Sequence, residues 1–532
     1  MHADLTTLAQ SFFCGEIVSI AAAPGLADWP CGVIPVMKAM HHSHPNSSST
    51  PKPGDRHLEC MKTGRQLSEG EAGMLPMEWL ALPPHPPAPL PPRAHASWLL
   101  RRLSNLLFYA AMPALSLLNA GVGLLLPMLL EPVAFGQYAL VVTLFQYALV
   151  FDFGLSQLTD RHVPKMLTGP VQSAALLAFR QGVLWTRLYI AAFLLIGGGM
   201  AAVLLQAHAP GFPSGPAWLS LAAGVYFMVV LGPASFYRAS SDRLAFGRIN
   251  ILVMLILALA RPAGLILGGI TGCFALLGLA YAALAAQVQA GMPLLWAARP
   301  GLVASARLVR QGLPLFLTSF VWAFYMTANR WVVSSLASGV DTGHFAFGSN
   351  VVTLVIGAVG ALSQYYYPAM VTRCAAEGPF AVSSALRRDF MLLALAMAVP
   401  TVMGILVGPT LVGWLYPKFL SSIPVMKWFL LAVPSLVVAS WLMPLGLSVG
   451  GSPWRESLVY PVALVILLAV TRLGFGVSGI TGAALGLVAS AMPLLVLQLW
   501  TLHRASLLRR ADASAIFAMT AAVTAAASLL LL

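Results

Sequence analysis

The chain has 532 residues, of which 59% are hydrophobic and only 9% charged, and its mean hydropathy is +0.82. A soluble domain carries roughly 25% charged residues, so this composition excludes a soluble fold and indicates that lipid is the solvent. The net charge of +13 does not indicate a nucleic-acid-binding protein, because the basic residues are scattered over short loops. Continuous apolar runs of about 20 residues favour membrane-spanning helices over a barrel.

The first 97 residues differ in composition from the rest of the chain. They contain a His/Ser/Pro cluster at 41–53 and a proline-rich run at 83–92, and no apolar run long enough to span a bilayer. We expect residues 1–97 to be a disordered or spurious extension, with translation beginning near Met74 or Met77. The alternative is a tail that docks a partner.

From Arg101 onward, apolar runs and short loops alternate regularly. This rhythm predicts an all-α, polytopic membrane protein with twelve transmembrane helices, and a weaker thirteenth at 513–532. The predicted spans are 104–130, 134–158, 183–205, 216–236, 249–269, 272–297, 312–336, 344–369, 390–411, 424–446, 457–474 and 478–502.

Basic residues in the short loops predict the orientation in the membrane. The loops that follow even-numbered helices hold 17 basic residues, whereas the opposite loops hold only Lys418, with Lys427 just inside helix ten. We therefore expect the residues before helix one, and the loops after even-numbered helices, to be cytoplasmic. The 17 are Arg161, Lys165, Arg180, Arg187, Arg238, Arg243, Arg248, Arg299, Arg307, Arg310, Arg373, Arg387, Arg388, Arg455, Arg504, Arg509 and Arg510.

Two short motifs recur at nearly the same offset. Gly136-Gln137-Tyr138-Ala139 returns as the motif at 343–346, 207 residues later, and the Gly-Ile-Thr-Gly at 269–272 returns at 479–482, 210 residues later. This predicts two parallel six-helix repeats at 98–300 and 301–510, followed by the extra segment 511–532. A duplicated bundle is typical of transporters that work by alternating access.

Four segments carry a resemblance to a known family. They are 131–138 with 151–155, Asn329-Arg330 followed by 343–345, 415–419 with 423–425, and 472–476 leading to 479–484. Residues 100–505 resemble the bacterial oligosaccharide-unit (O-antigen/polysaccharide) flippases of the multidrug/oligosaccharidyl-lipid/polysaccharide exporter superfamily. Asn329 stands where that family usually has an Asp, and Phe153 replaces a Leu.

The resemblance implies a function, a location and partners. It implies an inner-membrane transporter that flips an undecaprenyl-diphosphate-linked oligosaccharide for polysaccharide or lipopolysaccharide biosynthesis. Lipid-linked oligosaccharide and membrane lipids would be its partners, beside the polymerase and glycosyltransferases of the same pathway. No nucleic-acid partner, cofactor or metal site is expected.

Three arginines lie inside predicted spans, where a charge costs about 2.5–3.5 kcal/mol on insertion scales and is a candidate for function. Arg261, Arg330 and Arg472 each begin about 10–12 Å below the outer loop, at 1.5 Å per residue. Arginine binds phosphate in bidentate fashion, so we expect them to bind the diphosphate. The alternative is snorkelling to the headgroups. Pro262 loosens the helix beside Arg261 and favours the binding role there.

Polar residues inside the spans are further candidates. Asn329 and Gln364 are expected to line the substrate pathway, although packing between helices is an equal alternative for each. Asp152 ends the second predicted helix and is a candidate for coupling to a cation or proton. Its alternative role is to pair with a basic neighbour or to cap the chain at Gly154.

Three other functions compete with the flippase interpretation. A cation-coupled multidrug exporter of the same superfamily is the main alternative, but it should carry acids deep in its spans, and only Asp152 qualifies. A peptidoglycan-precursor flippase would share the same chemistry. A membrane polymerase or ligase needs a long outer loop with acidic or His groups, and the loop at 206–216 has only His208. No Walker loop, HExxH motif or nucleophile elbow is present, so we expect no enzyme activity.

Overall fold

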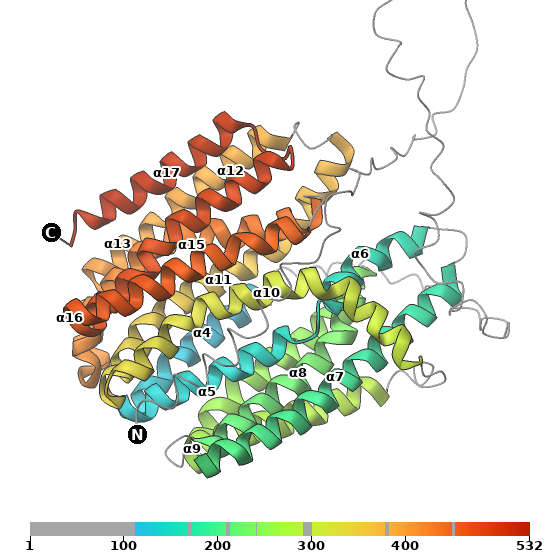
Figure 1. Cartoon of the computed structure of the whole chain (residues 1–532), viewed down its shortest axis with the longest axis horizontal. Helices are drawn as coiled ribbons and strands as arrows, with labels where there is room; N and C mark the ends of the chain where they lie inside the picture. Colours follow the sequence, from blue (N-terminus) through green and yellow to red (C-terminus); the bar gives the residue numbers. More distant parts are fainter. Residues whose placement is uncertain are drawn as a thin grey trace, which may run out of the picture.

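The structure is a computed structural model of the whole chain. It describes residues 112–168, 172–208, 213–240, 242–290, 300–377, 382–449 and 453–531. The extension predicted at 1–97 lies outside the described residues. Within them the chain is a bundle of long helices that run roughly side by side (Figure 1).

The first half of the bundle contains six helical elements. They are α4 (Met112–Leu129), α5 (Pro132–Val150), α6 (Leu155–Thr168), α7 (Gln172–His208), α8 (Ser214–Ala239) and α9 (Arg243–Ala290). A proline at the start of α5 suits a first helical turn, where its missing N–H costs nothing. The prediction was wrong for residues 159–168 and 172–182, which were assigned to a loop and instead form most of α6 and the start of α7.

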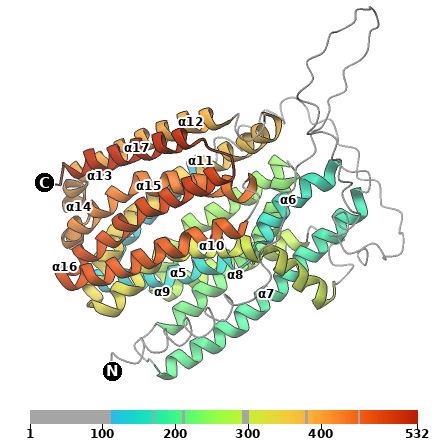
Figure 2. The same ribbon diagram turned by 45° about the horizontal axis from the view of Figure 1, so that its top comes forward.

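The second half follows the same order. Its elements are α10 (Leu302–Leu336), α11 (Gly339–Glu377), α12 (Ser383–Ala396), α13 (Ala398–Leu406), α14 (Gly408–Leu415), the 3₁₀ helix η7 (Pro417–Ser422), α15 (Ile423–Val449) and α16 (Pro453–Arg504). A last helix, α17 (Arg510–Ser528), packs against α12 and α15 (Figure 2).

Helices α9 and α16 are each a hairpin of two antiparallel limbs. In α9 the reversal falls at Gly268 and Gly269, and in α16 at Ser478 and Gly479. The φ angle is 60° at Gly269 and 61° at Gly479. Such positive φ values favour glycine because it has no Cβ. Both turns lie in the Gly-Ile-Thr-Gly repeats, so the sequence located them correctly. Each hairpin therefore supplies two crossings.

The two halves repeat the same internal packing. Helix α8 packs on α9 and α5 in the first half, as α15 packs on α16 and α11 in the second; α4 packs on α9 as α10 packs on α16. Nine helices in the described part are long and apolar enough to cross a membrane. Two of the nine, α9 and α16, are hairpins that reverse direction once, so each provides two limbs. The expectation of an all-α bundle with two parallel six-helix repeats is confirmed.

The bundle has two distinguishable ends. We call the end with the α9 and α16 reversals the turn end, and the opposite end, where α6 lies, the basic end (Figure 1). The loops predicted to be cytoplasmic join helices at the basic end. Several of these loop assignments were wrong, since Arg161 and Lys165 lie in α6 and Arg180 in α7. Arg187 also lies within α7 and is only 1% exposed.

Labelling of single cysteines should show which end faces the cytoplasm. Ser338 is exposed at the turn end and Ser384 is exposed at the start of α12. In a background without other cysteines, Ser338→Cys should react with a membrane-impermeant maleimide on intact cells. Ser384→Cys should react only after permeabilisation, since the basic loops face the cytoplasm. Reaction of Ser384→Cys in intact cells would invert the orientation.

Candidate functional site

Arg330 is a buried cation at the interface between the two halves. It is 3% exposed on α10, and its Nε donates to Ser349 Oγ at 2.7 Å and its Nη2 to Thr353 Oγ1 at 3.2 Å, both on α11. Burial of a charge is costly unless it is paired. The two hydroxyl oxygens solvate this guanidinium group without neutralising it.

Arg261 occupies a related position in the first half. It is half-buried on the first limb of α9, where its Nε donates to Leu257 O at 2.9 Å and its Nη2 to Asn119 Oδ1 of α4 at 3.1 Å. Asn119 is held in turn by bonds to the carbonyl oxygens of Leu115 and Met254. The contacts fix the arginine in place and leave its charge uncompensated.

The two arginines meet electrostatically at a tyrosine of α5. The buried hydroxyl of Tyr138 interacts electrostatically with the guanidinium groups of both Arg261 and Arg330. Nine residues further along α5, Tyr147 shares a hydrogen bond of 2.6 Å with Thr327 and accepts one of 3.0 Å from Trp331 Nε1. These two bonds join the two halves. We call Arg261, Arg330, Tyr138 and Tyr147 the central arginine cluster.

No carboxylate pairs with either arginine of this cluster among the residues that the structure describes. Two cations that are held by neutral oxygens in a low-dielectric interior create a positive potential. Such a place attracts an anion and repels a cation. The chemistry of the cluster therefore suits a phosphate or carboxylate group.

The other predicted site residues are placed differently. Asn329 is 1% exposed beside Arg330, and its Oδ1 has no hydrogen-bond partner in the described part of the chain. Arg472, in contrast to Asn329 and Arg330, is exposed on the first limb of α16. The Gln364 side chain lies outside the described side chains. The binding roles of Asn329, Gln364 and Arg472 stay predictions.

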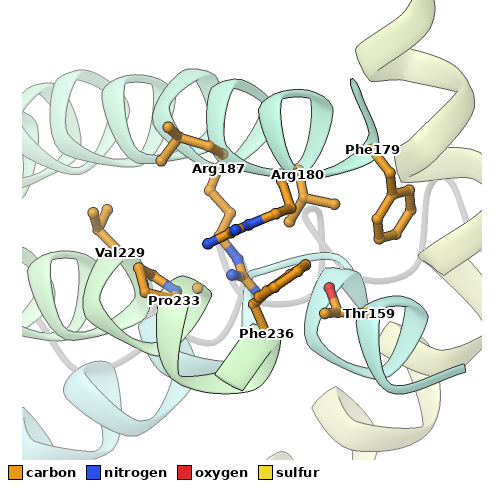
Figure 3. A pocket seen from close by; sticks show the side chains of 10 residues that line it. Thr159, Phe179, Arg180, Arg187, Val229, Pro233 and Phe236 are labelled. Carbon is orange, nitrogen blue, oxygen red and sulfur yellow. The ribbon is translucent and has the colours of Figure 1, made fainter. Parts of the chain in front are cut away.

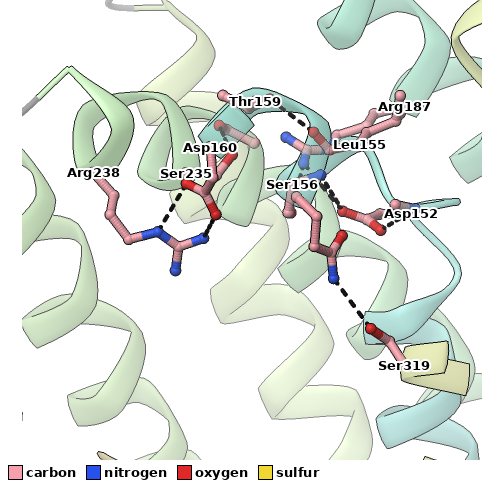
Figure 4. Close-up of polar contacts among 12 residues, drawn as sticks. Asp152, Leu155, Ser156, Thr159, Asp160, Arg187, Ser235, Arg238 and Ser319 are labelled. Carbon is pink, nitrogen blue, oxygen red and sulfur yellow. Dashed lines mark hydrogen bonds and ion pairs between the residues drawn. The ribbon is translucent and has the colours of Figure 1, made fainter. Parts of the chain in front are cut away.

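Asp152 is buried in the break between α5 and α6. Its carboxylate accepts from the backbone N–H groups of Gly154 and Ser156, each at 2.9 Å, and pairs with Arg187 at 3.2 Å (Figure 4). Gly154 has φ of 75°, which this cap stabilises. The pairing and capping role is confirmed, and ion coupling stays a prediction.

The repeat glycines bring the halves together at the turn end. A Cβ on Gly343 would lie 1.9 Å from Pro132 O, and a Cβ on Gly136 would lie 2.9 Å from Gly343 N. Around them, Phe135 packs edge-on against Phe419 with a centroid distance of 5.5 Å. Lys418 pairs with Glu131 across the same interface. The two halves are therefore closed against each other at this end.

Close contact recurs at the basic end, through a different pair of elements. A Cβ on Gly312 of α10 would lie 2.0 Å from Phe153 O in the break after α5. Phe153 also packs on Phe316 with a centroid distance of 4.7 Å. Helix α5 and the break that follows it thus contact the second half at the turn end, in the middle and at the basic end.

Several residues of the site escaped the sequence analysis. Ser349, Thr353 and Trp331 are ordinary polar or aromatic residues in apolar helices, and only their tertiary contacts give them a role. Arg187 carried one signal: Asp152 was expected to find a basic neighbour. Its separation from Asp152 by 35 residues could not be read from local spacing.

Comparisons with known proteins show a fold and no closer relationship. No protein-family model matches the chain, and no curated protein matches it. The solved MATE multidrug transporter DinF-BH is similar with a TM-score of 0.56 and 15% identity, over 76% of this chain and 95% of that one. A mutant of the Vibrio cholerae MATE transporter VcmN gives a TM-score of 0.54 and 13% identity, over 76% and 96%.

A third structure names the superfamily. It is an outward-facing multidrug resistance MATE family transporter of the MOP superfamily, with a TM-score of 0.51 and 13% identity, over 76% of this chain and 92% of that one. The chain is thus a multi-pass helical membrane protein. It has the fold of the MATE transporters of the MOP superfamily.

Proposed function

We propose that this chain is a membrane transporter that moves an anionic amphiphile across the bilayer by alternating access of its two halves. The observation that carries this proposal is the central arginine cluster, where one buried or half-buried cation from each half interacts with Tyr138 and neither pairs with a carboxylate among the described residues. Two bundles that rock about a shared site are the usual arrangement for such transport.

The identity of the cargo divides two candidates. The fold supports the multidrug exporter, which was the alternative from the sequence, more directly than the oligosaccharide flippase, because two of the solved structures reported above are multidrug transporters of the MATE family. Likeness at 13–15% identity concerns the fold, so it does not transfer their cargo.

The positive charge of the central arginine cluster favours the oligosaccharide flippase. A lipid-linked oligosaccharide carries a diphosphate, and guanidinium forks bind phosphate well. A cationic drug would meet Arg261 and Arg330 with no acid beside them among the described residues, and Asp152 is already engaged by Arg187. A flippase at the inner membrane would work next to the polymerase and glycosyltransferases of the same pathway.

Transport by the purified chain in proteoliposomes should separate the candidates. We expect movement of an anionic dye or of a polyprenyl-diphosphate-linked glycan, and none of ethidium, because the cluster repels cations. Movement of the glycan would assign the flippase, and movement of the anionic dye alone a multidrug exporter. Movement of ethidium alone, driven by a proton or sodium gradient, would overturn the anionic cargo.

A further inference from the structure

A groove lies between α12 and α17, the last helix of the chain, on the outside of the second half (Figure 2). Both helices begin at the basic end and run side by side toward the turn end (Figure 1). Two arginines line one part of the groove, and five apolar residues line the rest. We call it the α12–α17 groove.

The lining of the groove changes from cationic to apolar along its length. Arg387 and Arg388 lie near the start of α12. Residues three, four and seven positions after Arg388 fall on the same face of a helix, and the last of them lies about 10 Å further along. The apolar lining residues are Met391, Leu392 and Leu395 of α12, with Ala515 and Met519 of α17.

A buried aspartate fixes the start of α17 to the start of α12. Asp512 of α17 is 6% exposed, accepts a hydrogen bond of 2.6 Å from Ser383 Oγ and pairs with Arg387 at 3.2 Å. Ser383 Oγ in turn accepts the backbone N–H of Arg509 at 2.9 Å. These contacts hold the two walls of the groove together at the basic end.

Arg388 offers a free pair of donors at this end. Its side chain is 76% exposed, and its Nε donates to Asp389 Oδ1 at 3.2 Å. Its two Nη groups, which form the outer end of the guanidinium fork, make no hydrogen bond in the described part of the chain. They can therefore donate together to two oxygens of one phosphate.

Positive charge exceeds negative charge around these donors. The two carboxylates that contact the arginines of the groove are already engaged, Asp389 by Arg388 and Asp512 by Arg387. Two further arginines, at positions 509 and 510, are exposed at the start of α17 and form no ion pair with any described residue. The region therefore favours an anionic ligand over a zwitterionic one.

The groove is large enough for more than a phosphate group. About 380 Å³ of it is open to the centre of a water-sized sphere, and roughly 10–15 Å³ of such space holds one water. A phosphate would occupy a small part of this volume, and the remainder could take a stretch of acyl chain. Leu392 and Leu395 are 57% and 52% exposed, so they offer apolar surface to such a chain.

The cavity between α6, α7 and α8 makes a useful contrast (Figure 3). Only about 30 Å³ of it is open in the same sense, which is room for two or three waters. Its buried Arg187 is already paired with Asp152. That cavity excludes a lipid headgroup, whereas the α12–α17 groove admits one.

We propose that the α12–α17 groove binds one anionic phospholipid from the bilayer leaflet at the basic end. The lipid phosphate lies on the Nη groups of Arg388, and an acyl chain follows Leu392, Leu395 and Met519 toward the turn end. Basic pockets between membrane helices commonly bind anionic headgroups in this way. The site is separate from the central arginine cluster, so lipid binding can be measured without transport.

Native mass spectrometry of the purified full chain with equal amounts of phosphatidylglycerol and phosphatidylcholine tests the headgroup contact. We expect saturable retention of about one phosphatidylglycerol per chain, in preference to phosphatidylcholine. Arg388→Gln should weaken this retention by about fivefold or more, and the exposure of Arg388 means that the variant should fold. Arg310→Gln, which removes an exposed arginine of α10, is the matched control and should retain the lipid normally.

A change of shape without a change of charge tests the acyl-chain contact. Ala515→Phe would fill part of the groove and should also weaken the retention of phosphatidylglycerol by about fivefold or more. Ala525→Phe, at an exposed position of α17 outside the groove, should retain the lipid as the wild type does. Melting temperatures measured without added lipid show that the variants compared are folded, and added phosphatidylglycerol should stabilise the wild type more than Arg388→Gln.

Two results would overturn the proposal. Equal retention of both lipids, or equal retention by Arg388→Gln and Arg310→Gln, would mean that the groove meets only the general lipid of the bilayer. Normal retention by a folded Ala515→Phe would place the lipid outside the groove, on the surface arginines alone.

Discussion

Gly343→Ala is expected to lower the melting temperature of the protein and to reduce transport by about fivefold or more. The new Cβ would lie 1.9 Å from Pro132 O, a backbone atom that can move only with its helix. Overpacking typically costs about 1–3 kcal/mol. A cost of about 1.4 kcal/mol lowers the population of the state with this contact closed by a factor of ten. The contact between α5 and α11 at the turn end must therefore open. Thermal unfolding of the purified variant measures the loss directly.

The same helix offers a matched control. Gly357 also lies in α11, but a Cβ there would have no atom within 4 Å. Alanine is a better helix former than glycine by about 1 kcal/mol, so Gly357→Ala should melt at the wild-type temperature or above it. If Gly343→Ala behaves like Gly357→Ala in both assays, the close contact between the halves is not as described.

Arg330→Met should abolish transport of an anionic cargo, by about 100-fold or more, while the protein inserts and folds normally. Its two hydrogen-bond partners remain satisfied without it, because Ser349 Oγ donates to Ala346 O and Thr353 Oγ1 donates to Ser349 O. Removing an uncompensated buried charge also relieves desolvation. Cargo uptake into proteoliposomes and the melting temperature separate the two effects.

Conservative replacement sharpens this test. Arg330→Lys should keep part of the activity, since an ammonium group attracts an anion but lacks the bidentate fork. The exposed Arg310 on the same helix is the control, and Arg310→Met should transport normally. Wild-type transport by Arg330→Met would remove Arg330 from the binding site and leave the half-buried Arg261 as the remaining candidate.

The repeat turns were predictable from sequence because their chemistry is local. A hairpin reversal between two packed helices needs glycine at a positive φ, and the Gly-Ile-Thr-Gly motifs placed Gly269 and Gly479 there. The glycines at 136 and 343 were recognised as repeat anchors by offset alone. That they contact each other became evident only from the structure.

Environment could not be predicted in the same way. Arg261 and Arg472 are equivalent within one residue in the repeat, yet the first is half-buried and bound to Asn119, whereas the second is exposed. Equivalent positions in the two repeats have similar backbone conformations, but the side chains around them differ. Likewise, Arg187 reads as a loop cation until α6 and α7 fold and bring it to Asp152.

The approach of Gly136 to Gly343 has a consequence for the origin of the chain. On a two-fold axis, each residue of a subunit meets its own counterpart in the other subunit. Two repeat-equivalent glycines in mutual contact are what an isologous dimer of one six-helix unit would place on that axis. A single gene for such a unit would have met this steric requirement with one codon. After fusion the requirement falls on two codons, so neither glycine is free to diverge independently of the other.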